Sequence, residues 1–259
     1  MGKPTVIPRR AAAVAATLAT ATLSSHGQPV PTETEQVVVS GSGVQRRAFE
    51  TPYAISVVDQ SELRSAGPMV NLSESLSRVP GIVANLRNNY AQDLQLSSRG
   101  FGARATFGIR GLRLYTDGIP ATMPDGQGQV SHFDLAGAQR IEVLRGPFSA
   151  LYGANSGGVI SLISAAPTGN FYSVDGDVGS DGLWQARLGA EALLSGGWNI
   201  RVQASQFSTD GVRPHSAAER SLGNVRLGWV GEQDTVTLLM NSVDQPAQDP
   251  LGLTRQQFD

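Results

Sequence analysis

The sequence predicts an α+β domain over residues 48–168, followed over residues 169–259 by antiparallel strands of the kind that build transmembrane β-barrels. Two observations support this prediction. A glycine-rich stretch at 141–164 lies between two strand-like runs, which indicates a tightly turned backbone. From Phe171 onward, apolar and polar residues alternate with a period of two, which indicates strands with one apolar face.

The composition excludes several classes of protein. A net charge of −2 gives no overall basic field for nucleic acid, and the absence of cysteine excludes disulfides and thiolate metal sites. Hydrophobic residues make up 40% of the chain, but no apolar run approaches the length of a membrane-spanning helix.

The N-terminus has the pattern of a signal peptide. Basic residues precede a small-residue apolar run at 11–23, and Ser25 and Gly27 fit a cleavage site before Gln28. The alternative is a short helix of the mature protein, but the run has no polar stripe. We therefore expect residues 1–27 to direct export and to be removed.

Residues 28–47 form an expected flexible linker, rich in Pro, Thr, Ser and Gly. Within it lies a run of high strand propensity without a local partner: Glu35, Gln36, Val37, Val38, Val39 and Ser40. Such a run is suited to pairing with the sheet edge of another protein. The alternative is that it forms the first strand of the following domain.

The α+β domain is expected to begin with a strand at 54–58. Asp59 or Ser61 can then cap a helix that contains Leu63. A second helix is expected over 71–79, ending before a Pro-Gly pair. Further strands are expected at 141–144 and 159–163, and a strand that runs into a turn is expected within 114–120.

Five strands are expected after the domain, at 171–179, 183–194, 198–207, 222–230 and 235–243. A soluble β-sandwich shows the same alternation. However, strands of about 10 residues, joined by short turns on one side and longer loops on the other, are typical of transmembrane barrels. The short turns here are 195–197 and 231–234, and a long loop is expected at 208–221.

Five motifs, in order along the chain, resemble the plug domain of TonB-dependent outer-membrane receptors. They are NLSESLSRVPGIV (71–83), LQLSSRG (94–100), FGIRG (107–111), LYTDGIP (114–120) and IEVLRGPFSALYGANSGGVISLIS (141–164). The resemblance implies a plug with a small mixed sheet and short helices, enclosed by a barrel of about 22 strands in the outer membrane of a Gram-negative cell. Five strands cannot close such a barrel, so we expect this chain to be an N-terminal fragment of a longer, ferric-chelate type receptor.

The resemblance also implies a function, namely energised import of a scarce nutrient and no enzymatic reaction. The run at 35–40 resembles the TonB box, the peptide bound by the periplasmic energy transducer. Contacts between plug and barrel are implied for Arg99, Arg110, Glu142 and Arg145, with ordinary solvated charge as the alternative. No catalytic residue, metal ligand or cofactor is expected.

A local excess of arginine indicates the cargo. Between residues 84 and 116 there are five arginines and one acid, Asp93, which suits an anionic chelate such as a ferric siderophore. We expect Arg87, Tyr90 and Arg104 to bind it; packing within the plug is the alternative. A receptor for haem, cobalamin or another metal complex, or a soluble periplasmic plug-like module without transport, remain alternatives.

Overall fold

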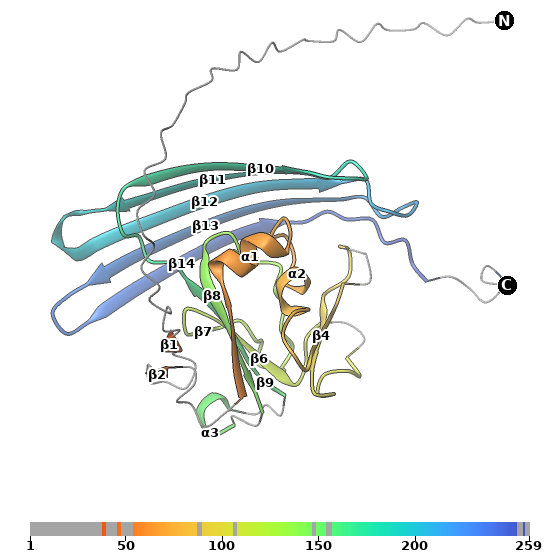
Figure 1. Cartoon of the computed structure of the whole chain (residues 1–259), viewed down its shortest axis with the longest axis horizontal. Helices are drawn as coiled ribbons and strands as arrows, with labels where there is room; N and C mark the ends of the chain where they lie inside the picture. The colour runs from red at the N-terminus through yellow and green to blue at the C-terminus, as the bar shows by residue number, and fades with distance from the viewer. Residues whose placement is uncertain are drawn as a thin grey trace, which may run out of the picture. The chain divides into compact units, whose positions relative to one another are not determined.

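A mixed α+β domain lies against a five-stranded antiparallel sheet, here called the wall (Figure 1). The computed structural model describes residues 38–39, 46–47, 54–86, 90–105, 108–146, 149–153, 157–252 and 256. Short strands β1 (Val38–Val39) and β2 (Arg46–Arg47) precede the domain. None of the helices in these residues is long and apolar enough to cross a membrane.

The α+β domain contains short strands and shorter helices. In chain order these are β3 (Ala54–Asp59), α1 (Gln60–Ala66), α2 (Ser73–Leu76), β4 (Ile82–Asn85), β5 (Gln95–Ser98), β6 (Leu112–Thr116), β7 (Ile119–Pro120), β8 (Ala138–Arg145), α3 (Ser149–Tyr152) and β9 (Gly158–Ser164). The main sheet has the order β3-β8-β9-β6-β7, in which only the β6–β9 pair is parallel, and β4 and β5 form a separate antiparallel pair.

The first helix begins where the sequence predicts. Asp59 caps α1: its Oδ1 accepts from the Glu62 N–H at 2.8 Å, while Glu62 Oε2 accepts from the Asp59 N–H at 3.0 Å. This reciprocal capping box satisfies two backbone donors that a helix start leaves open. The pKa of Asp59 is lowered because the Glu62 N–H and the Ser61 hydroxyl stabilise its carboxylate.

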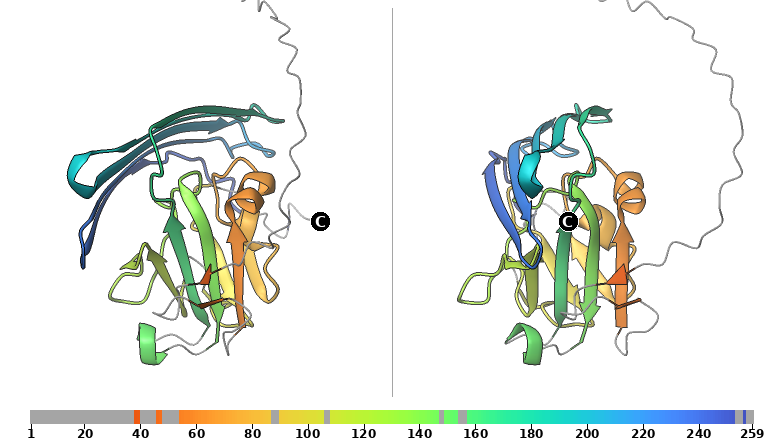
Figure 2. Two further views of the ribbon diagram at one scale, coloured as in Figure 1. Left: turned by 60° about the vertical axis from the view of Figure 1, so that its left-hand side comes forward. Right: turned by 90° about the vertical axis from the view of Figure 1, so that its left-hand side faces the viewer.

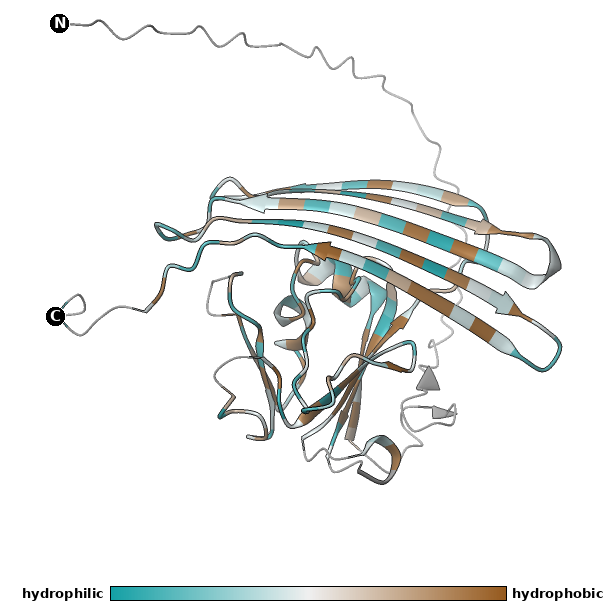
Figure 3. Ribbon diagram, turned by 180° about the vertical axis from the view of Figure 1, so that it is seen from behind, coloured by the Kyte–Doolittle hydropathy of each residue, from teal (hydrophilic) through white to brown (hydrophobic). Residues whose placement is uncertain are grey.

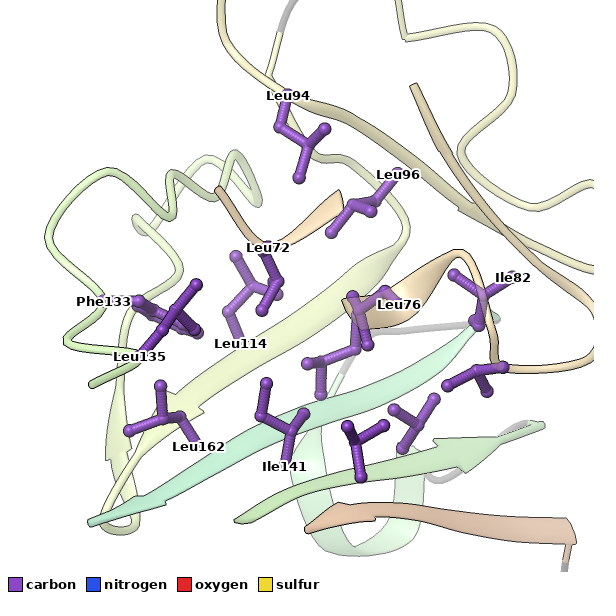
Figure 4. Packing of buried hydrophobic residues seen from close by; sticks show 14 of the residues in the cluster. Leu72, Leu76, Ile82, Leu94, Leu96, Leu114, Phe133, Leu135, Ile141 and Leu162 are labelled. Atoms are coloured by element: carbon purple, nitrogen blue, oxygen red, sulfur yellow. The ribbon is translucent and has the colours of Figure 1, made fainter. Parts of the chain in front are cut away.

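The second helix is shorter than the expected 71–79 and is regular only over α2, Ser73–Leu76. The expected apolar face is nevertheless present, because Leu72, Leu76 and Val79 are all buried in one core. Figure 4 shows Leu72 and Leu76 facing Leu114 and Ile141 of the sheet. Burial of this face, at about 25 cal/mol per Å² of apolar area, holds a helix of a single turn that would not persist in isolation.

The wall consists of five sequential antiparallel strands: β10 (Phe171–Val178), β11 (Trp184–Leu193), β12 (Trp198–Thr209), β13 (Ala218–Val230) and β14 (Thr235–Asp244). Its strands match the expected ones except at one connection. β13 begins at Ala218 and not at residue 222, because Ala218 and Arg220 pair in register with Thr209 and Phe207 of β12. The loop that was expected at 208–221 is therefore reduced to 210–217.

Polar and apolar residues alternate along the wall strands, as the colour bands in Figure 3 show, and successive side chains of a strand point to opposite faces, so the two faces differ in polarity. The polar residues Gln185, Asn199 and Arg201 are buried on the face toward the α+β domain, whereas Leu188 and Val174 are exposed on the other face. A soluble sandwich would place its apolar face inside. Figure 2 shows the wall curving over the domain, so its polar face is the concave one, as in a transmembrane barrel.

Gly158 shows why the glycine-rich stretch is needed. Its φ of +126° is a conformation that other residues rarely adopt, and a Cβ there would lie 2.0 Å from Leu144 O. The same residue pairs with Arg145 of β8, so its backbone lies in the middle of the main sheet. Glycine thus permits β9 to begin in close contact with the end of β8.

We expect Gly158→Ala to lower the free energy of unfolding of the α+β domain by about 3 kcal/mol or more, because the methyl group would displace Leu144 O. The matched control is Gly100→Ala, where φ is +87° but no atom lies within 4 Å, so that only backbone strain is added. Urea titration followed by limited proteolysis measures both. Equal effects of the two substitutions would contradict the role of the close approach.

Candidate functional site

Arg220 of β13 extends from the wall into the α+β domain and binds three backbone carbonyls. Its Nη1 donates to Val70 O at 2.5 Å, and its Nη2 donates to Ser131 O at 2.5 Å and to Phe133 O at 3.4 Å. The residue is only 4% exposed. A buried guanidinium has five donors and no acceptor, so it needs fixed acceptors around it. Arg220 therefore joins two separate loops of the domain to the wall.

The two preceding strands of the wall, β12 and β11, each supply a similar contact. Arg201 of β12 donates from Nη1 to Gly137 O at 2.6 Å, and its Nε binds Glu191 Oε1 at 2.8 Å. Arg187 of β11 donates from Nη1 to Pro68 O at 3.0 Å. β11, β12 and β13 are adjacent in the wall, and these three wall arginines all donate toward the domain. They lie at different levels of the strands, because Arg187 is opposite Ser205 and Arg220 is opposite Phe207 of β12, four and six residues along from Arg201.

Glu74 of α2 binds backbone N–H groups in the loop whose Val70 carbonyl accepts from Arg220. Its Oε2 accepts from the Met69 N–H at 2.7 Å, and its Oε1 accepts from the Val70 N–H at 3.0 Å and the Asn71 N–H at 2.8 Å. Burial raises the pKa of the Glu74 carboxyl, while these three N–H donors and the nearby Arg220 oppose that shift. Val70 is thus held by a plug-side carboxylate at its N–H and by a wall arginine at its C=O.

Asp134 holds Gly137 in the same way. Its Oδ1 accepts from the Gly137 N–H at 3.1 Å, while Gly137 O accepts from Arg201. Burial raises the pKa of Asp134; the Gly137 N–H, Arg201 and Arg220 act in the opposite direction. The backbones of two residues, Val70 and Gly137, are therefore each fixed by a carboxylate of the domain at the N–H and by an arginine of the wall at the C=O.

A second contact between domain and wall lies directly after the end of β14, at Gln245. Gln245 Nε2 donates to Tyr90 O at 2.8 Å, and the Tyr90 ring lies 5.2 Å from the ring of Phe207. Gln92 Nε2 donates to Asp249 Oδ2 at 2.9 Å. Burial raises the pKa of Tyr90 to about 12, so its hydroxyl is protonated at neutral pH.

A polar cavity of about 210 Å³ opens beside this contact. Its lining includes amide, hydroxyl and carboxylate groups from three loops of the domain and from the segment after β14: Asn71, Tyr90, Asp93, Gln129, Ser131 and Gln245. Gln129 Nε2 binds Asp93 Oδ2 at 3.3 Å across it. Hydrogen-bonding groups that converge on a concave surface can orient a small ligand.

The structure brings one of the three expected ligand residues to this cavity. Tyr90 lines it, whereas Arg104 is exposed on a turn after β5 and does not. Arg87 lies outside the described residues. The assignment of the three residues to a ligand stays a prediction.

The side chains of three of the four expected plug–barrel residues make polar contacts within the domain. Arg110 binds Gln127 Oε1 at 3.1 Å, and Arg145 donates to Pro80 O at 2.5 Å and to Ser56 Oγ at 2.9 Å. Glu142 is fully buried and pairs with Arg140 at 2.8 Å. Arg99 is exposed, in a left-handed backbone conformation with φ of 50°. Contacts of these residues with further wall strands stay a prediction.

The expected transducer-binding run is partly described. Val38 and Val39 form β1, which pairs antiparallel with Arg47 and Arg46 of β2. The sequence pattern predicted no local partner for this run, so the short pairing is a difference from that expectation. Glu35, Gln36, Val37 and Ser40 lie outside the described residues.

The sequence did not predict the contacts that Arg187, Arg201 and Arg220 make with the domain. The alternation after residue 183 places Arg187 and Arg201 on the polar face, but it gives no partner for either of them. Arg220 was assigned to a loop because the start of β13 was expected too late. An arginine at a polar-face position on each of three consecutive strands is the signal that could have indicated the contact.

Comparison with known proteins agrees with this arrangement. Residues 47–160 match the family model described as TonB-dependent Receptor Plug Domain. The chain is 34% identical over 166 residues to the vitamin B12 transporter BtuB of Photobacterium profundum, covering 60% of this chain and 26% of that protein. It is 26% identical over 210 residues to the ferrioxamine receptor of Yersinia enterocolitica, covering 78% and 28%.

A solved structure shows the same fold with both parts present. The ferric yersiniabactin uptake receptor FyuA of Yersinia pestis superposes with a TM-score of 0.61 at 24% identity, over 77% of this chain and 32% of that one. The match therefore extends beyond the plug into the wall. Residues 47–160 form a TonB-dependent receptor plug domain. The α+β domain is that plug, and the chain spans less than a third of the length of each of these three proteins.

We expect Glu74→Gln to destabilise the seated plug by about 2 kcal/mol at neutral pH, because one of the buried N–H groups loses its acceptor. The effect should grow on acidification. A carboxyl with a raised pKa stabilises the folded state below its ordinary value of 4.5, and this contribution is lost as the pH rises through the raised pKa. Glutamine does not titrate, so only the wild type gains this stability.

Limited proteolysis of the plug at neutral and mildly acidic pH measures this difference. Glu62→Gln is the control for loss of a glutamate charge, because this carboxylate is exposed and the glutamine oxygen can still accept from the Asp59 N–H. Parallel pH profiles of the wild type and Glu74→Gln would contradict the assignment.

Proposed function

We propose that the receptor containing this chain imports a metal chelate across the outer membrane, with a ferric siderophore or another anionic iron chelate as the leading cargo. The observation that carries the proposal is a plug seated against the polar, concave face of a membrane-type wall. A soluble binding module would not require the exposed apolar face that Leu188 and Val174 present. Relatives named for ferrioxamine and vitamin B12 support uptake of a metal complex, and the second keeps cobalamin as the alternative cargo.

The arrangement of loops supports a direction across the membrane. Connections at 194–197 and 231–234 are short and lie at one end of the wall strands, which we assign to the periplasm. The opposite end carries the 210–217 loop and the segment after β14, and it would face outward. Tyr90 and the polar cavity lie at this outward end, because Gln245 follows β14 directly.

Ligand recognition is assigned to this outward side of the plug. We assign Arg87, Tyr90 and Arg104 as ligand-binding residues, since they belong to a stretch with five arginines and one acid between residues 84 and 116. Guanidinium groups bind carboxylate and similar oxygen groups through paired hydrogen bonds. Asp93 in the cavity lining is the feature that opposes an anionic cargo.

Energy for transport would come from the periplasmic transducer through residues 35–40, after export directed by residues 1–27. A run with three successive valines is suited to strand addition. β1 has only two residues, and its pairing with β2 is short enough to be exchanged for a strand of another protein. Exposed Arg99 and Arg110 would meet wall strands other than β10–β14.

Uptake and binding can be separated by one substitution. We expect Val38→Pro to abolish energised uptake of a radiolabelled iron chelate while leaving surface binding unchanged, because proline removes a backbone donor that strand addition needs. Val38→Thr keeps the β-branched side chain and the donor, and it should transport normally. Uptake by the proline variant at the wild-type rate would contradict the role of this run.

The cargo assignment is tested on the arginines. We expect Arg87→Ala combined with Arg104→Ala to weaken binding of an anionic ferric chelate about tenfold or more, which corresponds to about 1.4 kcal/mol. The Arg87→Lys and Arg104→Lys pair keeps the charge and should lose less. Unchanged affinity in the alanine pair, together with tight binding of an uncharged cobalamin, would replace the leading cargo by the alternative.

A further inference from the structure

β3 is one of the two edge strands of the plug sheet, and β7 is the other. It lies at the edge in the order β3-β8-β9-β6-β7, and its pairing in that sheet is with β8 alone, from Ala54 opposite Arg145 to Asp59 opposite Arg140. It is also the first strand of the plug after the linker that carries residues 35–40. A pull on that linker reaches β3 before any other element of the plug (Figure 1).

The next element, α1, is held mainly by packing. Leu63 is buried in the plug core, and the helix makes polar contact with Arg78 through Ser65, at 3.3 Å to both its hydroxyl and its carbonyl. Among the described residues, no hydrogen bond joins β3 or α1 to the wall.

Hydrogen bonds from the plug to the wall begin directly after Gly67. Over residues 68–71, five backbone groups are fixed by charged side chains: Pro68 O by Arg187, Val70 O by Arg220, and three consecutive N–H groups by Glu74. Hydrogen bonds to charged groups are about twice as strong as neutral ones, and two of these side chains belong to strands of the wall. Force that arrives at Pro68 is therefore transferred to the wall.

β8, the strand with which β3 pairs, is also attached to the wall at its start. β8 begins at Ala138, directly after Gly137, whose carbonyl is held by Arg201 and whose N–H is held by Asp134. Loss of β3 would leave β8 paired with β9 and anchored at its start. It would uncover Glu142 and Arg145, which lie opposite Val57 and Ala54 in the register, so the new surface would carry charged groups.

We propose that Arg187, Arg220 and Glu74 form a mechanical stop at residues 68–71, which confines the transducer-driven rearrangement to the segment 54–67. On this account β3 and α1 leave the plug, while the remainder stays seated on the wall. The inference rests on the proposed function only for the source of the force. Arg187 and Arg220 act as positioning residues and need not contact the cargo.

A pulling experiment tests the stop without any cargo. Purified receptor, expressed from its own gene, is held in a bilayer and pulled through a handle at residue 48, directly after β2, so that the β1–β2 pairing does not carry the load. The first unfolding event should release residues 54–67, a contour length of about 50 Å when fully extended, and extension should then pause. With Arg187→Met and Arg220→Met together, the pause should disappear and the first event should lengthen.

Two results would overturn the proposal. One is a first event in the wild type that is clearly longer or shorter than residues 54–67 allow; this measurement does not depend on the folding of the arginine variant. The other is an unchanged pause in a double variant whose plug resists proteolysis as the wild type does. Failure of iron uptake in cells would instead contradict the proposed function and would leave the pulling result intact.

Labelling in cells extends the test to transport. Because the chain has no cysteine, Val58→Cys in β3 and Ser75→Cys in α2 provide single probes at sites that are 4% and 2% exposed. Maleimide labelling of Val58→Cys should rise during energised uptake, whereas labelling of Ser75→Cys should stay at its resting rate. Equal rises at both sites, or uptake without a rise at Val58→Cys, would contradict confinement to the segment 54–67.

Discussion

The contact between wall arginines and plug carbonyls is the constraint on which the seated plug depends. Irregular loops such as 68–71 and 130–137 cannot satisfy their buried backbone groups by sheet or helix pairing. Buried guanidinium groups on a polar wall face have the opposite need, because they lack acceptors. Each partner offsets the desolvation of the other, and neither would be stable in this position alone. Specific loops of the plug are thereby tied to specific strands of the wall.

The same contact divides the plug into parts with different freedom. The loops after Gly67 are hydrogen-bonded to the wall, as is the start of β8, while β3 is an edge strand paired with β8. Edge strands can leave a sheet at a lower free energy than central ones, since only one ladder of hydrogen bonds is lost. A receptor needs both properties: a plug that stays in place and a part of it that can move.

Much of this architecture could be predicted from local sequence patterns, because local forces decide it. Asp59 with Glu62 predicts the start of α1, and the period of two after Phe171 predicts the wall and its polar face. Partners distant in sequence could not be predicted. Nothing local indicates that Arg220 reaches Val70, 150 residues earlier, or that β13 begins as early as Ala218. The family motifs directed attention to Arg99 and Arg110, whereas the wall arginines belong to no such motif.

Hydrogen exchange of the plug amides in the resting receptor tests the central claim most directly. The account predicts that the N–H groups of Met69, Val70, Asn71 and Gly137 exchange far more slowly than those of β3, and that Arg220→Met accelerates exchange at Met69, Val70 and Asn71 before it affects the main sheet. Exchange from β3 as slow as that from residues 69–71, or no change at these residues in Arg220→Met, would contradict it.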